Sequence, residues 1–310
     1  MATASGSIRL FRLGGIDVYL HWAWFIAAAY FIHRAKGYSS PVWSVLEYLA
    51  LFGIVLLHEF GHALACRAVG GKANQIVLWP LGGVAYVTPP PRPGPQLISI
   101  AAGPMVNVVL AGMVGGVVAV STQFGLAPAG SDLRNFFYMV FAIAVALLVF
   151  NLLPIYPLDG GQIVRSLLWF VLGPAKSLMV TCIVSFVGIA GLILVAILAK
   201  SVGLGILSAF VLASCWGGLV HARALLRISQ LPRRTGVACP ACGAAPPLGA
   251  VWRCRNCNNQ FDPFGTAGVC TTCGATFAQA SCPECGSVHT MDDWIVRSTE
   301  SVATQQPESP

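Results

Sequence analysis

Charged residues are scarce in this chain, and their scarcity decides the class of protein. Lys, Arg, Asp and Glu make up 9% of the 310 residues, whereas 56% are hydrophobic and the mean hydropathy is +0.74. Soluble globular domains carry roughly 25% charged residues. The composition therefore excludes a soluble globule and predicts an integral membrane protein.

No cleavable signal peptide is expected at the N-terminus. The first residues do not combine a compact apolar region with a small-residue cleavage site, and the first apolar run continues into the body of the chain. We expect that run to serve as its own insertion signal. Six apolar stretches are expected to cross the membrane: residues 18–33, 44–69, 97–120, 136–153, 177–199 and 202–221.

Between the second and third stretches, residues 75–87 alternate loosely and contain too many glycines and prolines for a span, which predicts a small membrane-associated hairpin or sheet. The expected fold is thus an all-α polytopic membrane protein of about six transmembrane helices with this small β element and a small zinc-ribbon domain. The expected boundaries are residues 1–222 for the membrane domain, 223–236 for a basic linker, 237–297 for the ribbon and 298–310 for a disordered tail.

Basic residues predict the orientation in the membrane, because loops facing the cytosol are enriched in Lys and Arg. With six spans, four basic residues fall on one side: Arg34, Lys36, Arg134 and Lys200. Eleven fall on the other: Arg9, Arg12, Arg67, Lys72, Arg92, Arg165, Lys176, Arg223, Arg227, Arg233 and Arg234. This predicts a multi-pass protein of a bacterial or archaeal cell membrane with both termini in the cytosol.

The second apolar stretch contains an H-E-x-x-H motif formed by His58, Glu59 and His62. On a helix, histidines four residues apart project from one face and can bind one Zn²⁺, while the glutamate beside the metal can accept a proton from water. Ionisable residues inside a membrane span are costly and are read first as functional. The alternative is that the two histidines form hydrogen bonds between helices and have only a structural role.

A catalytic zinc needs a third protein ligand and one open position, and the apolar core offers few acids. Asp159 is the only acidic residue between Asp132 and Asp262. It lies in a segment broken by prolines and glycines, and irregular backbone at membrane depth is tolerated only inside protein or beside a watery cavity. An ordinary Asp-Gly turn remains the alternative for this residue alone.

These segments resemble the site-2 protease family of intramembrane zinc metalloproteases. The resemblance is carried by His58-Glu59-Phe60-Gly61-His62, by Asn151-Leu152-Leu153-Pro154 with Leu158-Asp159-Gly160-Gly161, by Ala102-Gly103-Pro104 with Asn107, and by Gly82-Gly83-Val84, over roughly residues 10–222. It implies that His58, His62 and Asp159 bind the catalytic zinc and that Glu59 is the general base. It also implies that Asn107 and Asn151 polarise the substrate carbonyl or order the site; packing between helices is the alternative for these two.

The expected function is therefore zinc-dependent hydrolysis of peptide bonds in or near transmembrane segments of membrane-bound substrates, in regulated intramembrane proteolysis. The substrate would be a single-span membrane protein or peptide in the lipid bilayer, unwound so that a carbonyl is free, and the strand 82–87 would pair with it. The alternative is a non-catalytic membrane scaffold or zinc-responsive protein whose ribbon recruits cytosolic partners.

Eight of the eleven cysteines form four Cys-x-x-Cys pairs after residue 238. Such pairs predict structural zinc held by four thiolates in a reducing compartment. The ligands are Cys239, Cys242, Cys254, Cys257, Cys270, Cys273, Cys282 and Cys285, which would bind two structural zinc ions. We expect sequential pairing of the first pair with the second and of the third with the fourth; nesting of the first with the last remains open. The other three, Cys66, Cys182 and Cys215, are expected to be small buried hydrophobes.

From Cys239 onward the chain has three basic residues and six acidic ones, and each zinc with four thiolates adds two further negative charges. Such a module is a poor ligand for phosphates, which disfavours nucleic acid as a partner. A cytosolic protein partner, or regulation of the protease, is the expected role of the ribbon. The basic linker is expected to lie against anionic lipid headgroups.

Overall fold

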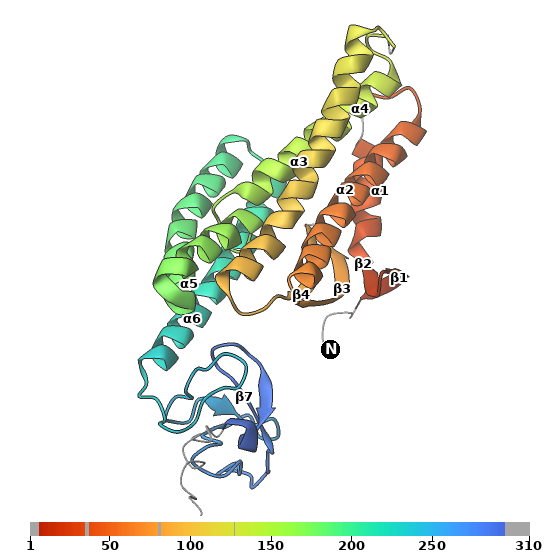
Figure 1. Ribbon diagram of the computed structural model, residues 1–310. Helices are drawn as coiled ribbons and strands as arrows, with labels where there is room; N and C mark the ends of the chain where they lie inside the picture. The colour runs from red at the N-terminus through yellow and green to blue at the C-terminus, as the bar shows by residue number, and fades with distance from the viewer. Residues whose placement is uncertain (1–5, 35–36, 80–81, 127, 295–310) are drawn as a thin grey trace, which may run out of the picture. The chain divides into compact units, whose positions relative to one another are not determined.

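The computed structural model describes residues 6–34, 37–79, 82–126 and 128–294. The chain divides into two compact units, residues 1–222 and residues 223–310. The first unit contains a four-stranded sheet and long apolar helices, and the second contains short hairpins and the paired cysteines (Figure 1). The chain is thus a mostly helical membrane protein with small sheets, followed by a cysteine-rich unit.

The sheet has the strand order β1-β2-β3-β4, from β1 (Ser7–Leu13), β2 (Ile16–His21), β3 (Lys72–Trp79) and β4 (Gly82–Thr88). Only the β2–β3 pair is parallel. Parallel neighbours need a crossover, and here the crossover consists of α1 (Ala23–Arg34) and α2 (Pro41–Ala68). Both ends of this helical hairpin therefore attach to one sheet.

The prediction of a membrane span over residues 18–33 is wrong in its first part, because Ile16–His21 is a strand. Ile16, Val18 and Leu20 alternate with more polar residues and are buried against α2, which is the period-2 pattern of a half-buried strand. What remains is α1, whose 12 residues extend about 18 Å. The hydrocarbon core of a bilayer is about 30 Å thick, so α1 alone is short for a span.

Among the described residues, five helices are long and apolar enough to cross a membrane. They are α2, α3 (Pro93–Gln123), α4 (Asp132–Leu152), α5 (Asp159–Leu198) and α6 (Val202–Gln230). The helix α2 begins earlier than the expected span 44–69, because Ser40 is the N-cap and its hydroxyl accepts a hydrogen bond from the Val42 amide. Ile54, Ala111 and Ala144 form the apolar contact of α2, α3 and α4.

The helices α5 and α6 cover more residues than the expected spans 177–199 and 202–221. A break at Gly173, which precedes Pro174, divides the 40 residues of α5 into two helices. The helix α6 continues to Gln230, so half of the expected basic linker is helical. Beyond it, Arg233 and Arg234 do not extend freely toward lipid headgroups: they form ion pairs with Glu284 and Asp262 of the ribbon unit.

The second unit is built from two small hairpins and a short helix. The strands β5 (Trp252–Arg253) and β6 (Gln260–Phe261) form one hairpin, and β7 (Gln279–Ser281) and β8 (Val288–Thr290) form the other; a 3-10 turn, η1 (Met291–Trp294), follows. Trp294 is fully buried beside Cys239 and Cys282. The apolar contacts are few, as expected of a fold that depends on metal.

Candidate active site and zinc clusters

The H-E-x-x-H motif lies on α2 where that helix is covered on both sides. His58, Glu59 and His62 are only 5%, 5% and 6% exposed. The Nδ1 atom of His62 donates to the Ser99 carbonyl of α3 at 2.9 Å, which leaves Nε2 as the free nitrogen of a neutral ring. That nitrogen lies 3.0 Å from Nε2 of His58.

Asp159 is the first residue of α5, directly after the irregular segment that follows α4. The segment is fixed by hydrogen bonds from the Tyr156 amide to the Ser185 hydroxyl, 2.7 Å, and from the Leu158 amide to the Ile155 carbonyl, 2.8 Å. The Oδ2 atom of Asp159 lies 3.0 Å from Nε2 of His58 and 3.4 Å from Nε2 of His62. Residues far apart in the sequence thus meet at one point.

The three atoms form a triangle whose size fits one zinc ion. Nitrogen and oxygen ligands bonded to tetrahedral zinc at about 2.0–2.2 Å lie roughly 3.3 Å from one another, and the separations here are 3.0, 3.0 and 3.4 Å. Two neutral imidazoles and a carboxylate are a donor set that zinc prefers, with a fourth position left for water or substrate. The residues present therefore fit a catalytic zinc.

Glu59 is held by the sheet rather than by another side chain. Its Oε2 atom accepts a hydrogen bond from the Ala85 amide of β4 at 2.8 Å. Gly83, two residues earlier in that strand, lies so close that an added Cβ would be 2.3 Å from Cγ of Glu59. The absence of a side chain at Gly83 is what lets the carboxylate reach the strand.

Gly103 of α3 has the same relation to the histidines. A Cβ at this position would lie 2.3 Å from Nε2 of His62 and 2.8 Å from Cε1 of His58. Sequence reasoning associated these glycines with the family but missed their physical role. It also missed Ser99 and Ala85, whose backbone groups make the contacts and leave no signal in residue type.

The two asparagines differ in burial. Asn107 is 1% exposed, and neither polar atom of its amide has a hydrogen-bond partner within the described part of the chain. Asn151 is half-buried near the end of α4. Their expected roles in catalysis stay predictions, although a buried amide without a partner is costly unless another group satisfies it.

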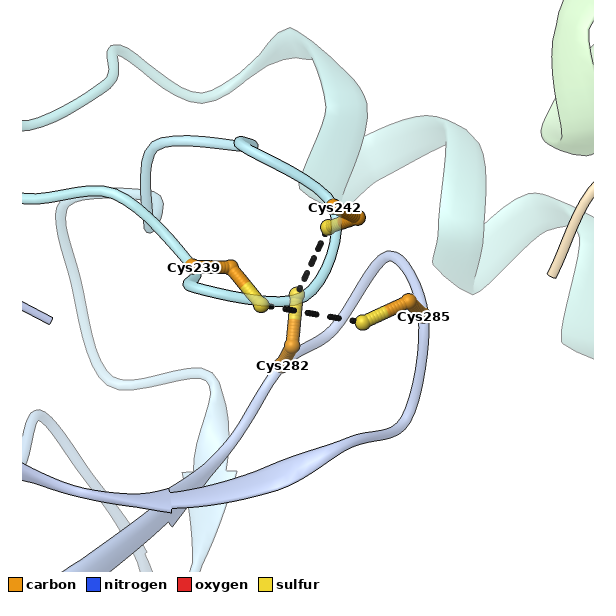
Figure 2. A group of neighbouring side chains, drawn as sticks. All are labelled: Cys239, Cys242, Cys282 and Cys285. Carbon is orange, nitrogen blue, oxygen red and sulfur yellow. Dashed lines mark hydrogen bonds between the residues drawn. The ribbon is translucent and has the colours of Figure 1, made fainter. Parts of the chain in front are cut away.

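The eight paired cysteines form two four-thiol clusters, and Figure 2 shows Cys239, Cys242, Cys282 and Cys285 pointing toward one another. The sulfur atoms of Cys239 and Cys285 are 3.7 Å apart, and so are those of Cys242 and Cys282. In the other cluster, Cys254–Cys273 and Cys257–Cys270 are 3.6 and 3.7 Å apart. Thiolates bonded to tetrahedral zinc at about 2.3 Å lie about 3.8 Å apart, whereas disulfide sulfurs are about 2.05 Å apart.

The expected sequential pairing is wrong: the first Cys-x-x-Cys pair meets the last, and the second meets the third. The ends of the unit are tied together by the Ala238 amide, which donates to the Trp294 carbonyl at 2.8 Å, and by the ion pair between Arg233 and Glu284. These contacts bring the outer pairs together. Spacing along the chain is compatible with both arrangements and so did not decide between them.

All four Cys-x-x-Cys turns share one backbone pattern. In each turn, the backbone carbonyl of the first cysteine accepts a hydrogen bond from the backbone amide of the residue that follows the second cysteine. The acceptor and donor residues are Cys239 and Gly243, Cys254 and Asn258, Cys270 and Gly274, and Cys282 and Gly286. The donors have positive φ angles of 60–73°, as glycine and asparagine permit.

Burial acts to raise the pKa of Cys239, but hydrogen bonds, first that of Ser287, bring this pKa down to about 6. At Cys239 the thiolate, which binds metal, is thereby favoured, whereas burial raises the pKa of Cys242 and Cys282.

Comparisons with known proteins agree with this geometry. A family model described as peptidase family M50 matches residues 47–127 and 112–195. A zinc metalloprotease of Methanocaldococcus jannaschii is 36% identical over 171 residues, which are 55% of this chain and 48% of that protein. A protein of Synechocystis sp. named as a candidate zinc metalloprotease is 32% identical over 180 residues, which are 54% and 46% of the two chains. This chain therefore spans about half the length of these relatives.

A solved structure, the site-2 protease from Methanocaldococcus jannaschii, resembles the chain with a TM-score of 0.50 and 28% identity. The similarity covers 69% of this chain and 95% of that one. The matched family segments contain the histidines of α2 and the aspartate of α5 whose side chains meet. Residues 47–195 of the chain thus match peptidase family M50, and the chain is similar to zinc metalloproteases and to a solved site-2 protease.

Proposed function

We propose that this protein is a zinc-dependent intramembrane endopeptidase that hydrolyses peptide bonds in or near transmembrane segments. The observation that carries the proposal is the convergence of His58, His62 and Asp159 within one zinc-sized triangle beside Glu59. All four side chains belong to helices apolar enough to cross a membrane. A relative of the chain is named as a zinc metalloprotease, which supports zinc-dependent peptide hydrolysis as the reaction.

In this proposal His58, His62 and Asp159 hold the zinc, which supplies Lewis-acid chemistry that polarises a carbonyl and makes water more acidic. Glu59 accepts the proton of the attacking water and passes it to the leaving amine. The Ala85 amide fixes Oε2 of Glu59 and leaves Oε1 for that proton. The buried, partnerless amide of Asn107 is suited to bond a polar group of the substrate, and we assign Asn151 the same kind of supporting role.

The substrate is a single-span membrane protein or peptide. Its helix must unwind locally before cleavage, because helical carbonyls are otherwise hydrogen-bonded. The parallel pairing of β2 with β3 supports a membrane topology in which α1 and α2 leave one face of the bilayer and return to it. Together with the basic residues on that side, it supports a cytosolic location for both termini.

We assign the zinc-ribbon unit to recognition of a cytosolic protein partner or to regulation of the protease. Arg253 and Arg255 are the only basic residues in the described range 237–294, against four acidic ones. Zinc bound to four thiolates would add negative charge to each cluster. This balance supports a protein partner over nucleic acid.

The test is cleavage of a panel of single-span membrane proteins reconstituted with the purified full chain. Glu59→Gln should keep its zinc and lose cleavage, by about 10²- to 10⁴-fold for loss of a general base. A zinc count of about three per chain is expected, one catalytic and two structural. Cleavage that persists in Glu59→Gln, or a count of two that is unaltered by changing His58, would favour a non-catalytic scaffold.

A further inference from the structure

A groove among the described residues lies far along the chain from the catalytic motif. It has a volume of about 560 Å³ and is formed by the end of α5, the short turn after it and the beginning of α6. Ile193 and Ile197 of α5 and Leu212 of α6 line it, and Gly205 lies along it with open space around its Cα. Ligand pockets in proteins commonly measure about 300–1,000 Å³.

The two helices touch elsewhere. The Cys215 thiol of α6 lies 3.5 Å from the Cys182 carbonyl of α5, and a Cβ at Gly218 of α6 would lie 3.2 Å from the Cys182 sulfur. The groove lies between α5 and α6 near the turn that joins them. An apolar groove in a membrane-spanning helical hairpin faces the hydrocarbon core of the bilayer, so a lipid acyl chain can fill it.

One charged side chain lies at the polar end of this groove. Lys200 is the only Lys, Arg, Asp or Glu among residues 177–222, and it lines the groove beside Ser201. No hydrogen bond or ion pair of its ammonium group is found in the part of the chain that the structure describes. Its φ angle is +48°, a helix-terminal conformation that usually selects glycine. The Ser201 and Ser208 hydroxyls are already bonded within α6.

We propose that this groove binds one anionic phospholipid, with an acyl chain between α5 and α6 and the headgroup phosphate on Lys200. A lysine at the end of an apolar helix reaches the interface with its stem along hydrocarbon and its charge in the headgroup layer. The lipid would fill the space that side chains leave between the two helices. The site lies at the opposite end of α5 from Asp159 and is independent of the protease assignment.

The charge is tested with the delipidated full chain in detergent, given palmitoyl-oleoyl phosphatidylglycerol or phosphatidylcholine, and bound lipid is counted by native mass spectrometry. The wild type should prefer phosphatidylglycerol about fivefold, which is the worth of one lysine near an anionic surface. Lys200→Gln should remove the preference. Lys176→Gln, an exposed lysine of α5 outside the groove, should keep it.

The binding of the acyl chain is tested by placing a larger side chain in the groove. Gly205→Leu should lower binding of both lipids, whereas Gly203→Leu, two residues away and not in the groove lining, should not; zinc content serves as the folding check for both. The proposal is overturned if the wild type does not discriminate between the lipids, or if Lys200→Gln retains the preference. Equal binding by Gly205→Leu and Gly203→Leu would likewise overturn it.

Discussion

Gly83 offers a way to separate the general base from the metal site. In Gly83→Ala the new Cβ would lie 2.3 Å from Cγ and 2.5 Å from Oε1 of Glu59. Carbon atoms in contact prefer about 3.5 Å or more, so the carboxylate or the strand must move by about 1 Å. Misplacement of a catalytic group by 1 Å can cost about 10²-fold in rate, and full loss of a general base costs up to about 10⁴-fold.

The expected loss for Gly83→Ala is thus about 10²- to 10⁴-fold in kcat/KM, with zinc content unchanged because its ligands are not touched. Gly103→Ala is the matched opposite: its Cβ would meet Nε2 of His62 at 2.3 Å, so this variant should lose the catalytic zinc as well as activity. Gly53→Ala, on α2 with open space around it, is the control for adding a methyl group and should behave as the wild type.

The assay combines cleavage of a reconstituted single-span substrate with zinc analysis of the same preparation. The reasoning is refuted if Gly83→Ala keeps more than a tenth of wild-type activity, since Glu59 would then tolerate the displacement. It is also refuted if Gly83→Ala and Gly103→Ala lose zinc to the same extent, because the sheet would then position the ligands rather than the base.

Three further variants test other parts of the structure. Asp159→Asn should release the catalytic zinc and lower the count by one ion per chain, measured by elemental analysis, whereas loss of no zinc would remove Asp159 from the ligand set. The double variant Cys242→Ser with Cys282→Ser should lose one ribbon zinc under nested pairing, and loss of two would restore the sequential pairing. Arg67→Ala should lower the free energy of unfolding by about 2 kcal/mol, measured by chemical denaturation, because the Arg67 guanidinium donates to the carbonyls of Ala73, Gly14 and Gly15; an unchanged stability would show that this link between α2 and the sheet is dispensable.

The polar residues of the membrane unit could be predicted because they stand out from an apolar background. An H-E-x-x-H motif in a long apolar run, and Asp159 as the only acid over a long stretch, are conspicuous in a chain with 9% charged residues. The long helices were predicted for the same reason, by length and hydropathy. Residue type was sufficient wherever the chemistry belongs to a side chain.

The errors fall where a backbone or a tertiary contact decides. Ile16–His21 was assigned to a span because its apolar residues adjoin a longer apolar run, although their alternation fits the strand that pairs with β3. The pairing of the cysteine turns depends on Ala238 meeting Trp294, a contact that spacing does not encode. The helix α6 extends beyond its apolar part because a helix needs no apolar residues to continue.

The candidate active site is a slot between two surfaces that lack side chains at the points of contact. On one side the sheet presents Gly83 to Glu59, and on the other side α3 presents Gly103 to the histidines. Only then can α5 bring Asp159 to within 3.0 Å of His58. The motif on α2 thus needs three other elements to become a site, each contributing through the close approach of its backbone or through one carboxylate. A chain with the same motif but with alanine at either glycine should retain the fold of α2 and lack the chemistry.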